Sequence, residues 1–169
     1  LLLLPEGGLV SVMRNERGDA EGFGSKICRA EPGSLGKWSC KHDPRKFDSP
    51  LLLEQGGEVY LLARRNVTET GHYDLGLDLP EEDLYLRYQL QYWQEPKRCT
   101  LWRVDPESLE VELVVDLPSR GDTCFPAAIR ENDSSFVVYN YSSPLDGEDL
   151  PWVKAQQGAT WIYRVLLTF

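Results

Sequence analysis

The sequence has little basic charge and few histidines: acidic residues outnumber basic ones by 27 to 18, and there are two histidines. The net charge of −9 argues against nucleic acid or an anionic membrane as a partner, because a phosphate-binding surface needs an excess of Lys and Arg. Apolar runs such as Leu1–Leu4 and Val59–Ala63 are far below the roughly 20 residues that cross a bilayer, so no membrane-spanning segment is predicted. With 41% apolar and 27% charged residues, the composition is typical of a folded domain.

Signatures of cofactor-dependent enzymes are also missing. There is no glycine-rich dinucleotide motif, no P-loop, no zinc-protease helix and no serine-hydrolase elbow. The cysteines, Cys28, Cys40, Cys99 and Cys124, form no C-x-x-C pair, so neither a metal nor another cofactor is predicted. Cys28 and Cys40 flank a turn symmetrically and would face each other in a hairpin, where a disulfide is possible. The favoured interpretation is two small apolar strand residues, because the other two cysteines show no such pairing.

The cellular compartment stays open. Three of the four asparagines, Asn66, Asn132 and Asn140, lie in N-x-S/T sequons, which hints at secretion. Asn140 lies in a strand-like apolar run where a glycan would not fit, so the hint rests on Asn66 and Asn132. The first residues lack the charged segment of a secretory signal, so a cytoplasmic location is also open, with the two sequons leaning weakly toward secretion.

The chain repeats itself, and each copy has the pattern of a β-hairpin: an apolar run, a turn and a second apolar run. The copies are Leu1–Asn15, Leu51–Arg65 and Ala127–Tyr141. They align without gaps, and Arg64 falls on Arg14 in the first copy and on Asn140 in the third.

Further strands follow each hairpin. Third strands are predicted at 25–30, 100–105 and 160–165, and fourth strands from residue 38 and at 109–117. Units of four antiparallel strands predict an all-β fold built from the blades of a β-propeller. The units are about 1–47, 48–121 and 122–169, with the first and last incomplete.

Two insertions interrupt the pattern. In the second copy, residues 66–98 contain Pro80 at a helix-start position, acidic residues in the next turn, and Tyr88 and Trp93 as apolar positions. This predicts a short helix inserted in the second blade. In the third copy, the composition of residues 142–158 predicts a loop.

Candidate site residues lie where the inner strands begin and the second strands end. Asp48 and Asp122 each precede a proline-led inner strand, and inner strands of a propeller converge on the mouth of the channel. Two carboxylates there are suited to glycoside cleavage, as general acid and as base or nucleophile. The alternative is that each aspartate caps its own turn.

Arginines and a tyrosine are the other candidates. Arg14 and Arg64 end second strands at matching positions, with Arg65 next in the chain, and guanidinium groups from different blades can clamp a carboxylate. The alternative is that they are strand-end arginines in salt bridges. Tyr141 either serves as a nucleophile beside a glutamate, as in exceptional glycosidases, or packs in the core or on a sugar.

The segments FGSKICRA, KFDSPLLLEQGGEVYLLARRNVTETGHYDLG and VVYNYSSPLDG resemble an uncharacterised branch of the sialidase-like (BNR, or Asp-box) β-propeller superfamily. The turn PGSLGKW is similar to the Asp-box hairpin S-x-D-x-G-x-x-W, with Gly36 and Trp38 kept and the aspartate absent. The FDSP segment is also similar to the Asp-Pro signature of related furanosidase and xylosidase propellers, with one residue inserted.

The resemblance implies a glycosidase with an arginine cluster for the substrate carboxylate, a Tyr–Glu nucleophile pair and an Asp acid/base. Arg14 and Arg64 fit the cluster, and Tyr141 with Glu16 fits the pair. Three functions are therefore open: a retaining exo-glycosidase of sialidase type, a glycosidase with an acidic pair only, and a non-catalytic propeller that binds glycan or protein.

Because a propeller needs about four to eight blades, the chain is expected to be the C-terminal part of a longer protein, with the missing N-terminal blades as its partner.

Overall fold

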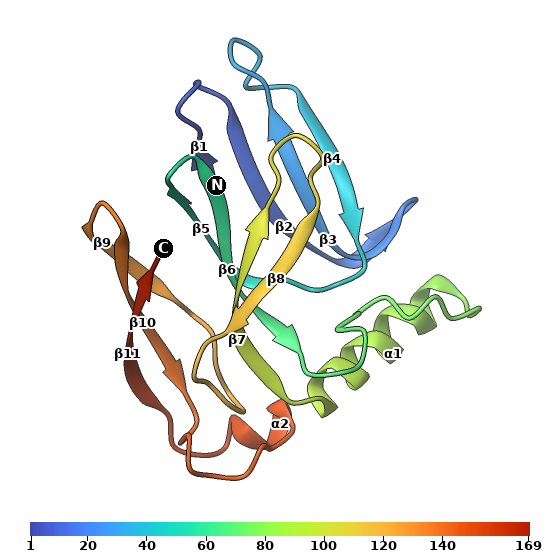
Figure 1. Cartoon of the computed structure of the whole chain (residues 1–169). Coiled ribbons are helices and arrows are strands. Elements are labelled where there is room, and N and C mark those ends of the chain that lie inside the picture. The colour runs from blue at the N-terminus through green and yellow to red at the C-terminus, as the bar shows by residue number, and fades with distance from the viewer.

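Three antiparallel sheets follow one another along the chain in the computed structural model, which describes residues 1–169 (Figure 1). The first sheet has the strand order β1-β2-β3-β4, the second β5-β6-β7-β8 and the third β11-β10-β9. The strands are β1 (Leu2–Leu3), β2 (Leu9–Asp19), β3 (Gly22–Ala30), β4 (Trp38–Asp43), β5 (Asp48–Gln55), β6 (Glu58–Asn66), β7 (Lys97–Val104), β8 (Val111–Asp116), β9 (Ala127–Asn132), β10 (Ser135–Ser142) and β11 (Trp161–Thr168). The predicted all-β class is confirmed, and so are the third and fourth strands of the repeat.

The hairpins form where the sequence supplies residues for tight turns. Gly56 and Gly57 connect β5 to β6 with φ angles of 61° and 85°, a left-handed conformation that glycine adopts without a steric penalty. In the third sheet the equivalent turn is Asp133–Ser134, where the Asn132 side chain accepts a hydrogen bond from the Ser134 amide at 2.9 Å.

The gapless alignment of the third copy is wrong by one residue in its second strand. Glu58 and Ser135 are the first residues of β6 and β10, each after a two-residue turn. Arg64 and Tyr141 each lie six residues further on, because 64 − 58 and 141 − 135 both equal six. The counterpart of Arg64 is therefore Tyr141 and not Asn140. The cause is a bulge in the third hairpin, and a slip of one residue moves every side chain to the opposite face.

The sheets stack through two apolar cores. The first core joins the first and second sheets and contains Leu4, Val10, Val12, Ile27, Phe47, Leu52, Val59, Leu61, Ala63, Trp102, Val104, Leu109 and Val111. The second core joins the second and third sheets and contains Leu53, Leu62, Cys99, Leu101, Leu117, Cys124, Phe136, Val138 and Leu167. The middle sheet is thus covered on both faces, which accounts for its long runs of apolar residues.

Two helices lie together at the end of the sheets opposite the β5–β6 and β9–β10 turns (Figure 1). The predicted helix is confirmed as α1 (Glu81–Gln94), which begins directly after Pro80. Its buried aromatic residues are Tyr88 and Tyr92, whereas Trp93, the other aromatic position named from the sequence, is exposed. Tyr92 follows Tyr88 by four residues, the spacing that keeps two side chains on one helix face.

The second insertion also contains a helix. The loop prediction for 142–158 is wrong at α2 (Trp152–Ala155), a single turn that begins after Pro151 and packs against α1. Neither α1 nor α2 has the length and apolar character needed to cross a membrane.

All four cysteines are bonded, so the favoured interpretation of Cys28 and Cys40 as unbonded residues is wrong. Cys28 on β3 and Cys40 on β4 are direct partners in the strand register and form a disulfide. Cys99 on β7 forms the second disulfide with Cys124, in the segment before β9. That pairing depends on the packing of the second sheet on the third, which spacing along the chain does not reveal.

The sequons differ in accessibility. Asn66 and Asn140 are buried, and the Asn140 amide donates to the Thr123 hydroxyl at 3.1 Å, which agrees with the expectation that a glycan would not fit there. Asn132 is exposed at the end of β9 and is the one sequon asparagine open to modification.

Candidate functional site

Polar side chains from all three sheets meet at the end that carries the helices. They form one continuous series of hydrogen bonds and ion pairs, which we call the inter-sheet network. Six of the seven predicted site residues belong to it: Arg14, Glu16, Asp48, Arg64, Asp122 and Tyr141. The strands explain the convergence, since β2, β6 and β10 end here while β5 and the segment before β9 begin here.

Asp48 is the centre of the network and is buried at the start of β5. Its Oδ1 accepts from Arg14 Nη1 at 3.2 Å, and its Oδ2 accepts from the Tyr92 hydroxyl at 2.5 Å. Lys46 Nζ and Arg64 Nη1 each lie 3.6 Å from Oδ2. Burial by itself would raise the pKa of Asp48, but the charges of Lys46 and Arg64 and the Tyr92 hydroxyl outweigh it and leave the pKa below its ordinary value.

Arg64 joins the second sheet to the third. Its Nε donates to the Thr123 carbonyl at 2.6 Å, and its Nη2 lies 3.4 Å from the Tyr141 hydroxyl. The guanidinium carbon also lies 4.8 Å from the ring centroid of Trp152 on α2, a cation–π distance. Arg64 is therefore held by contacts within the protein, and its side chain is only 6% exposed.

Asp122 and Tyr141 form the part of the network in the third sheet. The Tyr141 hydroxyl donates to Asp122 Oδ1 at 3.0 Å, and Trp152 Nε1 donates to the same oxygen at 2.9 Å. Burial raises the pKa of Tyr141 to about 12, although the neighbouring Arg64 charge acts in the opposite direction. The phenol is thus protonated at neutral pH and has a carboxylate in position to take its proton.

Glu16 lies on the first-sheet side of the network. Its carboxylate is 3.2 Å from Arg14 Nη1 and 3.0 Å from Lys46 Nζ, and it accepts from the Gln89 amide of α1 at 3.0 Å. The Tyr–Glu pair that the resemblance implies is not formed by Tyr141 and Glu16, because the Tyr141 hydroxyl is bonded to Asp122 instead.

Arg65 is the predicted site residue that lies outside the network. Neighbouring residues of a strand point to opposite faces, so Arg65 is directed away from its neighbour Arg64. Its Nε and Nη2 bond the two carboxylate oxygens of Asp116 on β8, at 2.9 and 2.6 Å. Arg65 is a salt-bridged strand-end arginine, as the alternative interpretation of the arginines has it.

Sequence reasoning did not find Lys46, Gln89, Tyr92 and Trp152. A signal exists for Lys46, which lies two residues before Asp48 and therefore on the same side of an extended chain. For Tyr92, the spacing of four from Tyr88 is the signal. Trp152 reaches Asp122 from an insertion whose position no sequence pattern predicts.

Lys97 lies beside the network at the start of β7 and is buried. Its Nζ donates to the carbonyls of Tyr92 and Glu95 at the end of α1, the latter at 2.7 Å. Burial, together with the nearby Arg64 charge, lowers the pKa of Lys97 to about 7. Lys97 thereby fixes the last turn of the helix that carries Tyr92.

The accessible groups of the network decide what chemistry it can perform. Arg14 has a side chain that is 56% exposed, so its remaining N–H groups face solvent and can bind an anion. Glu16, Asp122 and Tyr141 are partly exposed, whereas Asp48 and Arg64 are buried. The arrangement therefore offers a cation, two carboxylates and a phenol to a ligand, over a buried set of compensated charges.

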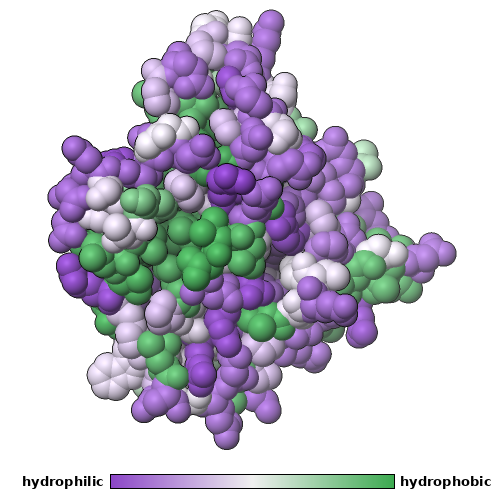
Figure 2. Space-filling model, viewed as in Figure 1, coloured by the Kyte–Doolittle hydropathy of each residue, from purple (hydrophilic) through white to green (hydrophobic).

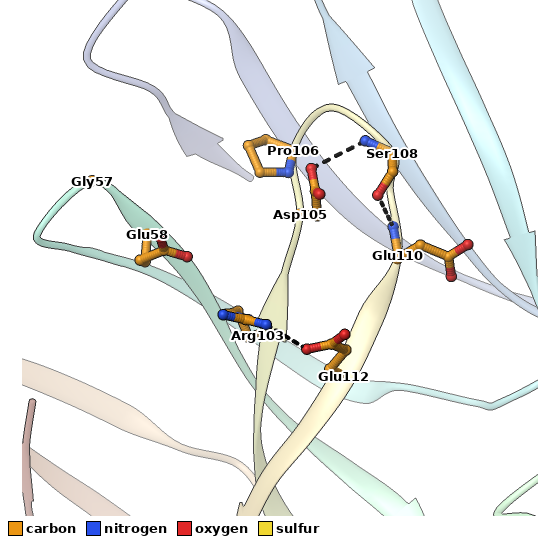
Figure 3. A pocket seen from close by; sticks show the side chains of 8 residues that line it. All are labelled: Gly57, Glu58, Arg103, Asp105, Pro106, Ser108, Glu110 and Glu112. Atoms are coloured by element: carbon orange, nitrogen blue, oxygen red, sulfur yellow. Dashed lines mark hydrogen bonds and ion pairs between the residues drawn. The ribbon is translucent and has the colours of Figure 1, made fainter.

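The hollow shown in Figure 3 is a different place. It has a volume of about 430 Å³ and is lined by Gly57, Glu58, Arg103, Asp105, Pro106, Ser108, Glu110 and Glu112, none of which belongs to the network. The Arg103 guanidinium is bonded to Glu112 at 2.6 Å, and Asp105 accepts from backbone amides of its own turn. These contacts describe a solvated, salt-bridged surface near the β7–β8 turn.

The chain has no cluster of three or more His, Cys, Asp or Glu side chains arranged to hold a metal ion. In comparisons with protein-family models, curated proteins and solved structures, nothing matched this chain.

Proposed function

We propose that the three sheets are blades of a β-propeller and that the inter-sheet network is the site of a glycosidase of sialidase type. The observation that supports this most is convergence, because a sugar ring can be held and cleaved only by groups that approach it from several elements. Arg14 comes from the first sheet, Asp122 and Tyr141 come from the third, and all three belong to one bonded series. The ligand is a carbohydrate that bears a carboxylate.

The roles follow from exposure and bonding. Arg14, the exposed cation, binds the substrate carboxylate. Tyr141 attacks the anomeric carbon while its proton passes to Asp122, and the glycosidic C–O bond breaks. Asp122 then gives that proton to the leaving oxygen, while Glu16 holds Arg14 in place as its ion-pair partner. Water then cleaves the tyrosyl–sugar bond, with retention.

Asp48 has a different task from the one its sequence position suggests. A general acid must carry a proton near neutral pH, and the lowered pKa of Asp48 leaves it ionised. Asp48 instead positions Arg14 and Arg64 through its two carboxylate oxygens.

The test is turnover of aryl glycosides by the purified chain. An aryl α-ketoside of sialic acid is expected to be hydrolysed, while aryl glucosides and xylosides, which lack the carboxylate, are not. Tyr141→Phe should lower kcat by about 10⁴-fold or more, as the loss of a nucleophile does. Tyr139→Phe is the matched control, since Tyr139 is an exposed tyrosine of the same strand outside the network. Equal activity of the two variants would refute the assignment.

A non-catalytic propeller that binds acidic sugars is the second candidate. The observation that favours it is the burial of Asp48 and Arg64, whose charges are compensated within the fold. Binding of sialic acid without turnover, measured by saturation-transfer NMR, would support it. Arg14→Gln should then abolish the signal, while Arg87→Gln, at an exposed position of α1, should leave it intact.

A further inference from the structure

The contact between neighbouring sheets is made twice in the chain, each time by matching faces. In the first sheet, Val10 and Val12 face the second sheet. In the second sheet, the residue that aligns with Val12 is Leu62, and it faces the third sheet. In both cases the face of the strand that carries these residues, on β2 or on β6, packs on the next sheet along the chain.

The third sheet presents the same face to solvent. The residue of β10 that matches Leu62 is Tyr139, which is exposed. Around it lie exposed apolar side chains of all three strands, including Ile129 on β9 and Ile162 and Leu166 on β11. Ile162 is 77% exposed, although its strand partner Tyr141 belongs to the inter-sheet network. We call this the trailing face.

The first sheet has the complementary face open. In β6, Ala63 faces the first sheet, and its aligned residue in β2 is Met13, which is exposed. Leu2 and Leu4 pack into the first core, so the alternating residues Leu1 and Leu3 point the other way, and Leu3 is 64% exposed. We call this surface, made by Leu1, Leu3 and Met13, the leading face.

Exposed apolar side chains also gather near the middle of the molecule. Figure 2 shows them over the region in which Figure 1 places β8, β10 and β11. On β8 the exposed residues are Leu113, Val114 and Val115. Extended apolar patches of this kind mark interaction surfaces. The leading and trailing faces differ from the β8 patch because each is one half of a contact that the chain itself makes twice.

We propose that the trailing face of one copy of this chain packs on the leading face of a second copy. The contact is head-to-tail, and such a contact either closes into a ring or continues into a filament. Two copies supply 3 + 3 = 6 sheets, within the range of about four to eight at which a ring of sheets closes. Closure covers both faces in both copies and leaves none open.

The experiment is the mass of the purified chain in solution, by light scattering after gel filtration. The expected species is a dimer. Ile162→Lys on the trailing face and Leu3→Lys on the leading face should each give monomers, because a buried unpaired ammonium opposes the contact. Leu86→Lys, at an exposed apolar position of α1, is the matched control and should stay dimeric.

Mixing the two variants distinguishes a contact between a trailing and a leading face from a contact between two trailing faces. An equimolar mixture of Ile162→Lys and Leu3→Lys retains one intact trailing-to-leading contact per pair and should recover a weaker dimer. A dimer that Ile162→Lys dissociates but Leu3→Lys does not would contradict the proposal, because it would show trailing faces packed on each other. A chain that stays monomeric at 100 μM would also contradict it and would favour a separate sheet, such as another part of the same protein, as the occupant.

Discussion

Replacing Asp48 with asparagine tests how far the inter-sheet network stabilises the fold. The substitution keeps the size of the side chain and removes its charge. Arg14 then loses a carboxylate at 3.2 Å, and Lys46 and Arg64 each lose one at 3.6 Å. Arg14 is largely exposed and water compensates it, and Lys46 keeps the Glu16 carboxylate at 3.0 Å. Arg64 is buried and remains as a cation without a carboxylate partner.

The magnitude follows from the buried Arg64 cation. At 3.6 Å, two unit charges interact by about 4.6 kcal/mol with an effective dielectric constant near 20. The buried cation is desolvated in the unchanged protein and in Asp48→Asn alike, so that cost cancels between them. Removal of the carboxylate should therefore lower the free energy of unfolding by about 3–5 kcal/mol, as breaking a buried pair does. Urea denaturation at pH 7, followed by circular dichroism, measures the difference.

The control and the pH dependence make the test specific. Asp146→Asn, at an exposed loop position, should change the free energy of unfolding by less than about 0.5 kcal/mol. The folded-state pKa of Asp48 is depressed, so its contribution is fully present above the unfolded pKa of about 4 and is lost as the pH falls through the folded pKa. As the pH falls, the free energy of unfolding of Asp48→Asn should therefore decrease less steeply than that of the unchanged protein. A loss below about 1 kcal/mol at pH 7 would refute the account of a charge-compensated network.

Three further outcomes are expected. Tyr92→Phe removes one hydrogen bond to an ionised carboxylate and should cost about 1.5–3 kcal/mol, less than Asp48→Asn; a larger loss would contradict the ranking of the two contacts. Because the folded pKa of Lys97 is about 7 and the unfolded value about 10.4, the unfolded chain binds the extra proton between them. The urea midpoint should therefore rise from pH 7 to pH 9, and Lys97→Met should remove that rise. Reduction of the Cys99–Cys124 disulfide opens a loop with a sequence separation of 25, which should cost about 3–4 kcal/mol; Cys99→Ser/Cys124→Ser measured in oxidising buffer checks it.

The strand order was predictable from the sequence because turns and alternation carry it. The copy containing Gly56–Gly57 marks its hairpin clearly, and the apolar runs on either side have strand length. The register of the third copy was not predictable, since Phe136–Tyr139 is apolar at every position and shows no alternation. A bulge in its partner strand is then invisible in the sequence.

The candidate site was predictable to the extent that it depends on strand ends. Asp48, Arg64 and Tyr141 lie at ends that the repeat superimposes, and all three belong to the network. The groups supplied by the helices were not predictable, because an insertion is placed by tertiary packing. Tyr92 and Trp152 reach the network in this way.

The Cys99–Cys124 disulfide has a consequence for cleavage of the chain by proteases. The turn between β7 and β8 is exposed at Glu107 and Ser108, which is where a protease would cut. The cut falls between the two bonded cysteines, so the piece with the first sheet and β5–β7 and the piece with β8 and the third sheet stay covalently joined. Such a nick would be silent on a non-reducing gel and would separate the two pieces only after exposure to thiols.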